Sequence, residues 1–459
     1  MIFETDKPEK LKDDLLILKG ILEETHAGTY AYNSQPTLDK LFDSINNTIT
    51  RPLTKREFLD KVDFIVESIH CAHTDCYFPE KYFDTLTGRK YFFPIPLIRI
   101  EDNLYVNSNV YSIPAGSEVF LLNNHFVKEI YKKLLYHRHT DGLNTGNKDA
   151  AINNDFAYNY FIAFGPEKEF EIRYRNAETK EVEIRTINAE KLDNISLSKF
   201  DDMYYNFPTD FLYDLTILEP KSTAILTITS FDESSYSQKT AFFNFLENSF
   251  TLMRLKGTKN LVIDYRNNAG GYFNCSYKLL SYFISSPMRQ FDSAVRRFNK
   301  LPYKKYVSKA DSSMQMRIDS SYGSYLPKPN HNYMLKMPEI DTCFPADNLF
   351  KGKTYIITNG NVVSAAASSA SLLKELAGAT IVGEETGGGY AAFNSEILSY
   401  TLPNSGIRVD IPTIRYYPTV SKKENIHAVK PDHYIPLTIE DLLDFEDGPM
   451  KFILDSLIR

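Results

Sequence analysis

The sequence predicts an α/β protein, and its periodicity, length and composition carry that prediction. From about residue 220 onward, short apolar strands alternate with helices, which is typical of a parallel sheet with right-handed crossovers. The 459 residues exceed the length of one ordinary domain, so two or three domains are expected. Hydrophobic residues make up 43% of the chain and charged residues 24%, a globular composition that argues against wholesale disorder.

Charge and hydropathy exclude two classes of partner. The 52 basic and 59 acidic residues give a net charge of −7, and no basic block marks a nucleic-acid interface. No apolar run reaches the roughly 18–20 residues that a membrane span needs. The first residues lack the apolar stretch of a secretory signal, which leaves open a mature form whose leader has been removed. Nothing in the sequence indicates the oligomeric state.

Residues 1–80 are predicted to form a helical N-terminal region. Leucine and isoleucine recur at near-helical spacing between residues 11 and 21. Thr54 and Glu57 have the spacing of a capping box, and an apolar helix face follows from 58 to 69. That helix leads into a short segment rich in histidine and cysteine.

Residues 90–200 are predicted to form a second module of short strands. Charged and apolar residues alternate in its last two strands, as in half-exposed antiparallel strands. A turn precedes one strand, and a helix is expected after it. The expected strands are 91–98, 118–122, 160–163, 170–174 and 182–186, and the expected helix is 126–135.

Residues 215–459 are predicted to form the α/β core. Its strands are short continuous apolar runs, the kind that is buried on both faces. A polar insertion over 287–350 interrupts the alternation, and such insertions are more often functional or mobile than structural. The expected strands are 224–228, 261–264, 354–358 and 379–382, and the expected helices are 242–255, 276–284 and 364–376.

Two glycines follow a buried strand at the end of segment 264–271. Gly270 and Gly271 have no Cβ, so backbone N–H groups beside them are open to a ligand. Such N–H groups bind an anion or a developing oxyanion. A tight turn between strand and helix is the alternative interpretation.

A serine begins the predicted helix at 364. Ser364 is followed by small residues that let the helix pack close to a sheet. The N-terminus of a helix stabilises a nearby alkoxide or oxyanion. The simpler interpretation is that Ser364 only caps the helix.

A glycine-rich loop follows the last predicted strand of the core. Gly387 and Gly388 belong to a triple glycine whose amides would be free to bind substrate. The loop is not a phosphate-binding loop, because the Gly-Lys-Ser/Thr ending is missing.

Together these segments resemble the catalytic core of the tail-specific, or carboxyl-terminal processing, serine peptidases and their relatives, the tricorn core protease and the interphotoreceptor retinoid-binding protein modules. In that family one strand ends in Asp-x-Arg-x-Asn-x-Gly-Gly. A second strand ends just before the nucleophilic Ser, which Ala follows, and a third reads Ala-Thr-Ile-Val-Gly-Glu-x-Thr before glycines. The matching segments here are 264–271, 364–365 and 379–389, in the same order. The resemblance covers about 220–435 well, 50–76 moderately and 90–200 weakly.

The resemblance points to the tricorn-like branch of this family. The tail-specific branch uses a Lys base after Thr-Phe-Gly, and no Lys stands in the equivalent stretch here. The tricorn-like branch uses Ser, His and Glu, with its His in a Gly-His-Thr-like motif. Ala-His-Thr around His73 is similar, and a segment similar to the family's Glu motif, one residue longer, begins at Glu424.

The resemblance therefore implies a serine peptidase that forms an acyl-enzyme. It implies a crotonase-like layered core, peptide or protein substrates, no metal, no organic cofactor and a periplasmic or extracellular location. An imidazole is suited to take the serine proton near neutral pH, and a carboxylate fixes its tautomer. The implied residues are Ser364 as nucleophile, His73 as general base, Glu424 as supporting carboxylate, Ala365 with Gly270 or Gly271 as oxyanion donors, and Gly387 and Gly388 in substrate binding.

Several alternatives remain open at this stage. His73 would otherwise be a structural residue, or one ligand of a metal site within 70–76, although ligands so close in sequence rarely complete a tetrahedron. His427 is a rival base because it lies near Glu424 in the sequence. Cys71 and Cys76 would form a disulfide if the protein is exported.

The module at 90–200 and the whole chain each have a second interpretation. The strand and turn at 113–124 are similar to part of a PDZ domain, which binds a peptide as an added strand. The expected carboxylate-binding loop is not evident, so a degenerate PDZ domain is predicted. A catalytically inactive module that binds peptides or apolar ligands on the same fold is the alternative to an enzyme.

Overall fold

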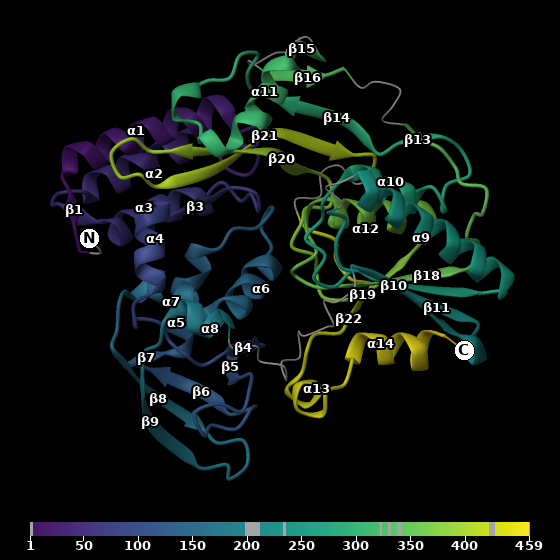
Figure 1. The fold of residues 1–459 in the computed structure, drawn as a ribbon, viewed down its shortest axis with the longest axis horizontal. Helices are drawn as coiled ribbons and strands as arrows, with labels where there is room; N and C mark the ends of the chain where they lie inside the picture. The colour runs from purple at the N-terminus through teal and green to yellow at the C-terminus, as the bar shows by residue number, and fades with distance from the viewer. Residues whose placement is uncertain are drawn as a thin grey trace.

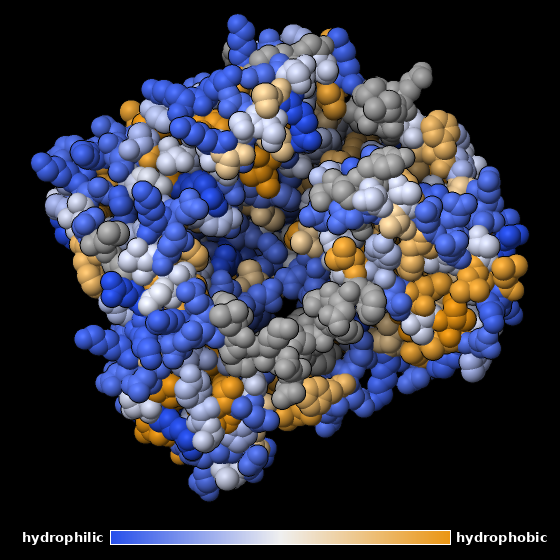
Figure 2. All heavy atoms as spheres, viewed as in Figure 1, coloured by the Kyte–Doolittle hydropathy of each residue, from blue (hydrophilic) through white to orange (hydrophobic). Residues whose placement is uncertain are grey.

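The computed structural model describes residues 3–197, 212–232, 236–321, 324–328, 332–336, 342–421 and 427–458. It has the mixed α/β fold that the sequence predicts. Figure 1 shows the N-terminal helices and the second module on one side and the α/β core on the other. Strands β20, Phe393–Thr401, and β21, Arg408–Pro418, span the two. Figure 2 shows the same face hollowed between these parts. No helix in the described ranges is long and apolar enough to cross a membrane.

The N-terminal region is helical, as predicted. Thr54 caps α3 through a complete capping box with Glu57, and α3 ends shortly before the His/Cys-rich segment. Strand β3, Asp75–Tyr77, then pairs antiparallel with β21 of the core, which fixes this segment to the rest of the molecule. The helices are α1 Pro8–Thr25, α2 Gln35–Thr48, α3 Lys55–Glu67 and α4 Glu80–Thr87.

The second module is a six-stranded antiparallel sheet with helices packed on it. The strand order is β4-β5-β6-β8-β9, with β7 His125–Phe126 paired to β6. Its elements are β4 Leu97–Ile100, β5 Asn103–Val106, β6 Glu118–Leu122, α5 Val127–Leu134, α6 Gly146–Asn154, α7 Phe156–Phe164, β8 Glu169–Arg175, β9 Val182–Asn188 and α8 Leu192–Leu197. The predicted strands at 118–122, 170–174 and 182–186 are confirmed.

Two strand predictions in this module are wrong. Residues 160–163 belong to α7, a helix that is apolar on nearly all sides and buried, so periodicity did not distinguish it from a buried strand. Of 91–98, only the last two residues lie in β4, because prolines at 94 and 96 keep the preceding stretch out of the ladder.

The α/β core contains a six-stranded sheet of order β10-β11-β12-β18-β19-β22. Strands β11 to β22 are parallel, and β10 is an antiparallel edge. All four predicted core strands are confirmed within one residue. The elements are β10 Tyr213–Leu218, β11 Thr223–Ile228, α9 Tyr236–Leu255, β12 Asn260–Asp264, α10 Phe273–Leu280, β18 Lys353–Thr358, α12 Ser364–Ala377, β19 Thr380–Gly383 and β22 His433–Tyr434. Helix α10 begins and ends earlier than the predicted 276–284.

The segment at 287–350 is partly structural, because it supplies three strands to a second sheet. The sheet order is β15-β16-β14-β21-β20, and β3 joins at β21. Leu11 and Leu15 of α1 share one buried cluster with Leu398 and Val409 of this sheet, so it binds the N-terminal helices to the core. The elements are β13 Met288–Arg289, β14 Phe291–Arg296, α11 Ser312–Ser320, β15 Tyr325–Lys328, β16 Asn332–Leu335, β17 Thr342–Cys343, β20 Phe393–Thr401 and β21 Arg408–Pro418. Short helices α13 Ile439–Asp444 and α14 Gly448–Phe452 follow the core.

Candidate active site

Ser364 has a strained backbone at the start of helix α12. Its φ is +52°, in the left-handed region that side chains with a Cβ rarely adopt. The N-cap of α12 is Val363, and no side chain caps the helix, so the capping interpretation of Ser364 is not supported. Such strain persists only where the surroundings impose it, and it concentrates at functional sites.

Two of the predicted glycines lie against Ser364. A Cβ added to Gly270 would come within 2.7 Å of the Ser364 Cβ and 2.9 Å of the Ala365 nitrogen. A Cβ added to Gly388 would lie 2.9 Å from the Ser364 nitrogen. The loops after β12 and β19 thus approach Ser364 so closely that only glycine fits at both positions.

The backbone N–H groups of the three predicted oxyanion donors differ in whether they already have a hydrogen-bond acceptor. The Gly270 N–H donates to Asn268 Oδ1 at 2.9 Å, and the Gly270 carbonyl accepts from the Phe231 N–H at 2.8 Å. Gly271 and Ala365 have no such acceptor for their N–H groups within the described ranges. Of the three predicted oxyanion donors, these two amides are therefore open for a ligand.

A network of asparagines holds the loop after β12 against the loop after β18. Asn267 Oδ1 accepts from Asn359 Nδ2 at 3.0 Å and from Asn361 Nδ2 at 2.9 Å. The Val363 N–H donates to the Asn268 carbonyl at 3.2 Å. The sequence contains these asparagines inside the predicted segments, but their role in fixing Ser364 against Gly270 is visible only in the fold.

The acid and the arginine of segment 264–271 have a structural role. Arg266 pairs with Asp264 at 2.6 Å and with Asp447 at 2.6 Å. Because Asp447 caps α14, these ion pairs tie the loop after β12 to the C-terminal helices.

His73 lies in the segment between α3 and β3. Burial lowers the pKa of His73, and the nearby Asp141 raises it by a smaller amount. The imidazole is therefore neutral near pH 7, the state that a general base needs. Its Nδ1 atom is buried and has no hydrogen-bond partner among the described residues.

A carboxylate, that of Asp141, lies near this histidine. Ligand atoms of Cys71, His73 and Asp141 all lie within 4.8 Å of one another. The Ala72 N–H donates to Asp141 Oδ1 at 3.0 Å, whereas the buried Oδ2 has no partner in the described part of the chain. Asp141 is not predicted from the sequence, because it lies in an irregular loop that no motif marks.

The glycine loop after β19 connects the histidine segment to Ser364. Gly388 packs on Ser364, while a Cβ on Gly389 would lie 3.7 Å from the Asp141 Cβ. Thr140 Oγ1 donates to the Gly387 carbonyl at 3.3 Å. One side of the loop thus contacts the serine and the other contacts the segment of Asp141.

Of the predicted supporting carboxylate and the rival base, the structure describes only the rival base. Glu424 lies outside the described residues. His427 is described, and its carbonyl accepts from the Tyr390 N–H at 3.1 Å beside the glycine loop.

The disulfide suggested between Cys71 and Cys76 is not formed in the structure. Cys71, Cys76, Cys275 and Cys343 are all free and buried. Burial raises the pKa of the Cys71 thiol to about 12, so it is not an activated nucleophile despite its place beside His73.

The suggested metal site at 70–76 divides into two separate groups. Cys71 and His73 face Asp141, whereas Asp75 and Cys76 face Asp63 on α3. The pleat of the short strand β3 and the turn before it send the two sets of side chains to different places.

A cavity of about 800 Å³ adjoins Gly270 and Gly271. Its far wall comes from α11 and β20, where Arg317 pairs with Glu396. Burial raises the pKa of the Glu396 carboxyl, and the residue has a φ of +60°. The insertion thus supplies one wall of the space next to the candidate oxyanion donors.

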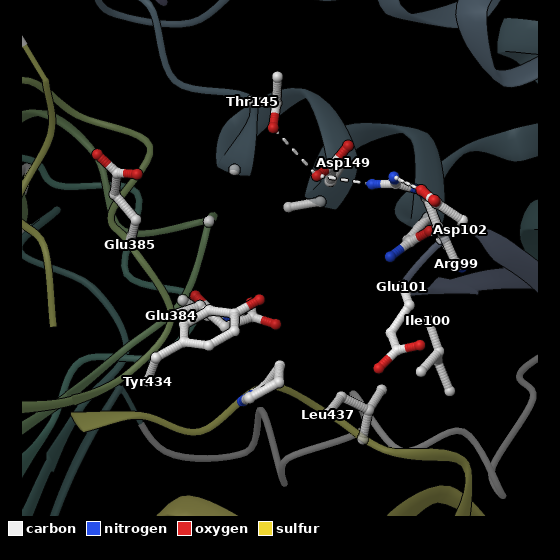
Figure 3. A pocket seen from close by; sticks show the side chains of 16 residues that line it. Arg99, Ile100, Glu101, Asp102, Thr145, Asp149, Glu384, Glu385, Tyr434 and Leu437 are labelled. Carbon is white, nitrogen blue, oxygen red and sulfur yellow. Dashed lines mark hydrogen bonds and ion pairs between the residues drawn. The ribbon is translucent and has the colours of Figure 1, made fainter.

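A second cavity, of about 500 Å³, lies between the second module and the carboxyl ends of β18 and β19. Figure 3 shows Asp149 between Thr145 and Arg99, with Glu384 and Tyr434 facing the same space. Arg99 Nη1 lies 3.1 Å from Asp149 Oδ2. Burial, reinforced by Glu384, raises the pKa of Asp149 to about 6 in spite of Arg99.

Comparisons with known proteins identify a family domain and similar folds. Residues 222–435, a little under half of the chain, match Peptidase family S41. No curated protein matches the sequence. The structure of mature CPAF complexed with lactacystin has a TM-score of 0.68 at 14% identity, covering 98% of this chain and 97% of that one. A protein from Parabacteroides merdae, named only provisionally as a peptidase, has a TM-score of 0.50 at 14% identity, covering 99% and 98%. At such identities the likeness to these structures concerns the fold alone.

Proposed function

We propose, from the Peptidase family S41 domain that residues 222–435 form, that this serine-type peptidase cleaves peptide bonds with Ser364 as its nucleophile. The observation that carries the proposal is the strained φ of +52° at Ser364, in a position where two glycine loops meet. A serine forced out of the helical conformation at a helix start resembles the nucleophile of other hydrolases, which sits on a similarly strained turn.

His73 is the proposed general base. It takes the Ser364 proton as the hydroxyl oxygen attacks the peptide carbonyl, and it later returns a proton to the leaving amine. Its neutral state at pH 7 supports this role. Acylation and then hydrolysis by water complete the turnover.

Gly271 and Ala365 are the proposed donors to the tetrahedral oxyanion. Their N–H groups are open in the described structure, and the helix start at Ala365 adds its partial positive charge. Losing one such donor typically costs about 3 kcal/mol in the transition state. Gly270 and Gly388 serve mainly by leaving space around the serine, whereas Gly387 packs against Gly360 and Asn147.

The supporting carboxylate has two candidates. Glu424 is the residue that the family resemblance implies. Asp141 is supported by the described geometry, because one of its carboxylate oxygens lies within 4.8 Å of a ring nitrogen of His73. Asp141 Oδ2 and His73 Nδ1 are also both buried without a hydrogen-bond partner among the described residues. We assign Asp141 the role of holding the His73 ring and keep Glu424 as a second carboxylate to be tested beside it.

The proposal also covers the type of core, the second module, the branch of the family and the location of the protein. We take the core as crotonase-like and the second module as PDZ-like. Its edge strand β9 carries the exposed Val182 and Ile184. Such an edge would accept a peptide as an added strand. The absence of a Lys base supports the tricorn-like branch, and export to the periplasm or the outside follows from that family resemblance.

A fluorophosphonate probe tests the proposal directly. We expect the probe to label the wild-type chain and to leave Ser364→Ala unlabelled. His73→Ala should lose peptidase activity while its melting temperature stays nearly unchanged. A wild-type chain that folds but is never labelled would favour an inactive peptide- or ligand-binding module on the same fold.

A further inference from the structure

We propose that Cys71, His73 and Asp141 bind one zinc ion, and that this ion reversibly inhibits the peptidase by occupying its base. The inhibitory part rests on the proposed role of His73, whereas the binding part does not. Nothing in the expected mechanism uses Cys71, which nevertheless lies beside the base, 1% exposed.

The three side chains offer the donor atoms that zinc prefers. Sulfur, nitrogen and oxygen ligands bind Zn²⁺ at about 2.0–2.3 Å, usually in a tetrahedron. The three ligand atoms already lie within 4.8 Å of one another, so small side-chain rotations bring them to a common ion. The fourth position is left for water.

Two unsatisfied atoms point to an absent partner at this place. His73 Nδ1 and Asp141 Oδ2 are both buried without a hydrogen bond among the described residues. Asp141 is only 2% exposed, and the charge of the buried Arg415 interacts with it without a close ion pair among the described residues. Buried polar atoms normally have partners. In the metal-free enzyme the proposed contact between Asp141 and the His73 ring would satisfy these atoms, and in the zinc-bound form the cation would satisfy them instead.

Neighbouring groups hydrogen-bond to Asp141 and Cys71 and orient them, while leaving atoms free to bind the metal. The Ala72 N–H holds Asp141 Oδ1 at 3.0 Å and leaves Oδ2 free. Asn394 Nδ2 donates to Cys71 Sγ at 3.2 Å. Such outer hydrogen bonds fix the orientation of metal ligands in known sites.

The second Cys-containing group is a poorer zinc site. It consists of Asp63, Asp75 and Cys76. Asp63 is already paired with His137 at 2.7 Å and with His139 at 2.9 Å, so its oxygens are taken by protein cations. We therefore place the metal at the first group and use the second as an internal control.

Zinc binding would switch the tautomer of the base. The Cys71 thiol loses its proton to solvent and binds as thiolate, while Asp141 binds as carboxylate, so the two negative charges balance the ion. The neutral His73 ring keeps one proton. When Nδ1 binds the metal, that proton stands on Nε2, and the ring has no lone pair left to accept the serine proton.

Cobalt substitution tests the site independently of activity. We add Co²⁺ to the full-length, metal-stripped chain and record the thiolate-to-cobalt charge-transfer absorption. We expect one band that disappears in Cys71→Ser, Cys71→Ala and His73→Ala and persists in Cys76→Ser. Melting temperatures of all variants show whether a lost band reflects a lost fold.

Zinc titration of the peptidase then tests the inhibition. Wild type should lose activity at one equivalent of bound zinc and regain it with chelator. Cys71→Ser should keep its basal activity, with an inhibition constant raised at least about tenfold.

The outcomes separate the two proposals. A band that persists in Cys71→Ser and disappears in Cys76→Ser moves the metal to the second group and overturns the inference, as does a wild type with neither band nor inhibition. A chain without peptidase activity that still shows the Cys71-dependent band keeps the metal site and rejects the proposed function.

Discussion

Gly270 lies directly against Ser364, close enough that a Cβ on the glycine would come within 2.7 Å of the serine Cβ. The glycine also has a φ of +95°, which an alanine adopts only under strain. This contact joins the loop after β12 to the start of α12. A substitution at Gly270 therefore tests whether this close packing is needed for activity.

We expect Gly270→Ala to lower peptidase activity at least about tenfold and to cost about 1–3 kcal/mol of unfolding free energy, because the added methyl displaces Ser364 and the backbone is strained. Gly257→Ala is the matched control. Gly257 also has a positive φ, of +64°, but nothing lies within 4 Å of its Cβ position. Kinetics and urea unfolding of both variants check the prediction, and equal losses of activity would contradict it.

The carboxylate partner of His73 is tested by two amide substitutions. If Asp141 orients the ring, Asp141→Asn should lower kcat by about 10²–10⁴-fold with little change in KM, since the amide favours the wrong tautomer. Glu424→Gln should then have the smaller effect on kcat. A larger loss in Glu424→Gln would assign the supporting role to Glu424 instead.

Asp14→Asn controls for the general cost of neutralising a buried aspartate. Asp14 accepts from the Ser405 N–H at 2.7 Å and lies in the N-terminal helix α1, away from the glycine loops. It should lower the melting temperature and leave kcat unchanged. Steady-state kinetics and thermal unfolding of the three variants decide the case.

Sequence periodicity predicts the core sheet well and the module less well. Continuous apolar runs such as 261–264 and 354–358 become buried parallel strands within one residue of the prediction. The run at 160–163 is equally apolar but becomes helix α7, since a short buried segment carries no period of its own.

In the candidate site, too, some residues could be predicted from the sequence and others could not. Ser364 and Gly270 are predicted because each follows a recognisable strand and belongs to a familiar motif. Asp141 reaches His73 only through the packing of an irregular loop, and the asparagine network depends on two loops that are about ninety residues apart. Contacts between segments so far apart in the chain leave no pattern in the local sequence from which they could be predicted.

The cavity beside Gly271 is expected to bind substrate. Arg317 lines it from α11 and pairs with Glu396 on β20. Arg317→Ala should raise KM several-fold with little change in kcat, because a wall residue contributes to binding in ground state and transition state alike. Lys304→Ala, which removes the exposed pair with Asp319 near the same helix, is the control and should change neither constant. Unchanged KM in Arg317→Ala would remove this cavity from the substrate path.

Asp149 should make the stability of the protein depend on pH. Its pKa is raised by burial to about 6 in the folded state, against about 3.9 in an unfolded chain. The folded state therefore binds the proton more tightly, and protonation stabilises it. This contribution is fully present below about pH 4 and is lost as the pH rises through about 6. The difference of about 2 between the two pKa values corresponds to at most about 3 kcal/mol.

Asp149→Asn removes this titration while keeping the shape of the side chain. The variant should gain stability relative to wild type as the pH rises from 4.5 to about 7.5, even though it loses the pair with Arg99. Asp102→Asn also removes a carboxylate from Arg99, but from a site that is 76% exposed, and it is the control for the ion pair. Urea midpoints measured across this pH range give the comparison. Parallel curves for wild type and Asp149→Asn would mean that the Asp149 carboxyl is solvated in the folded protein and that the cavity beside it is open to water.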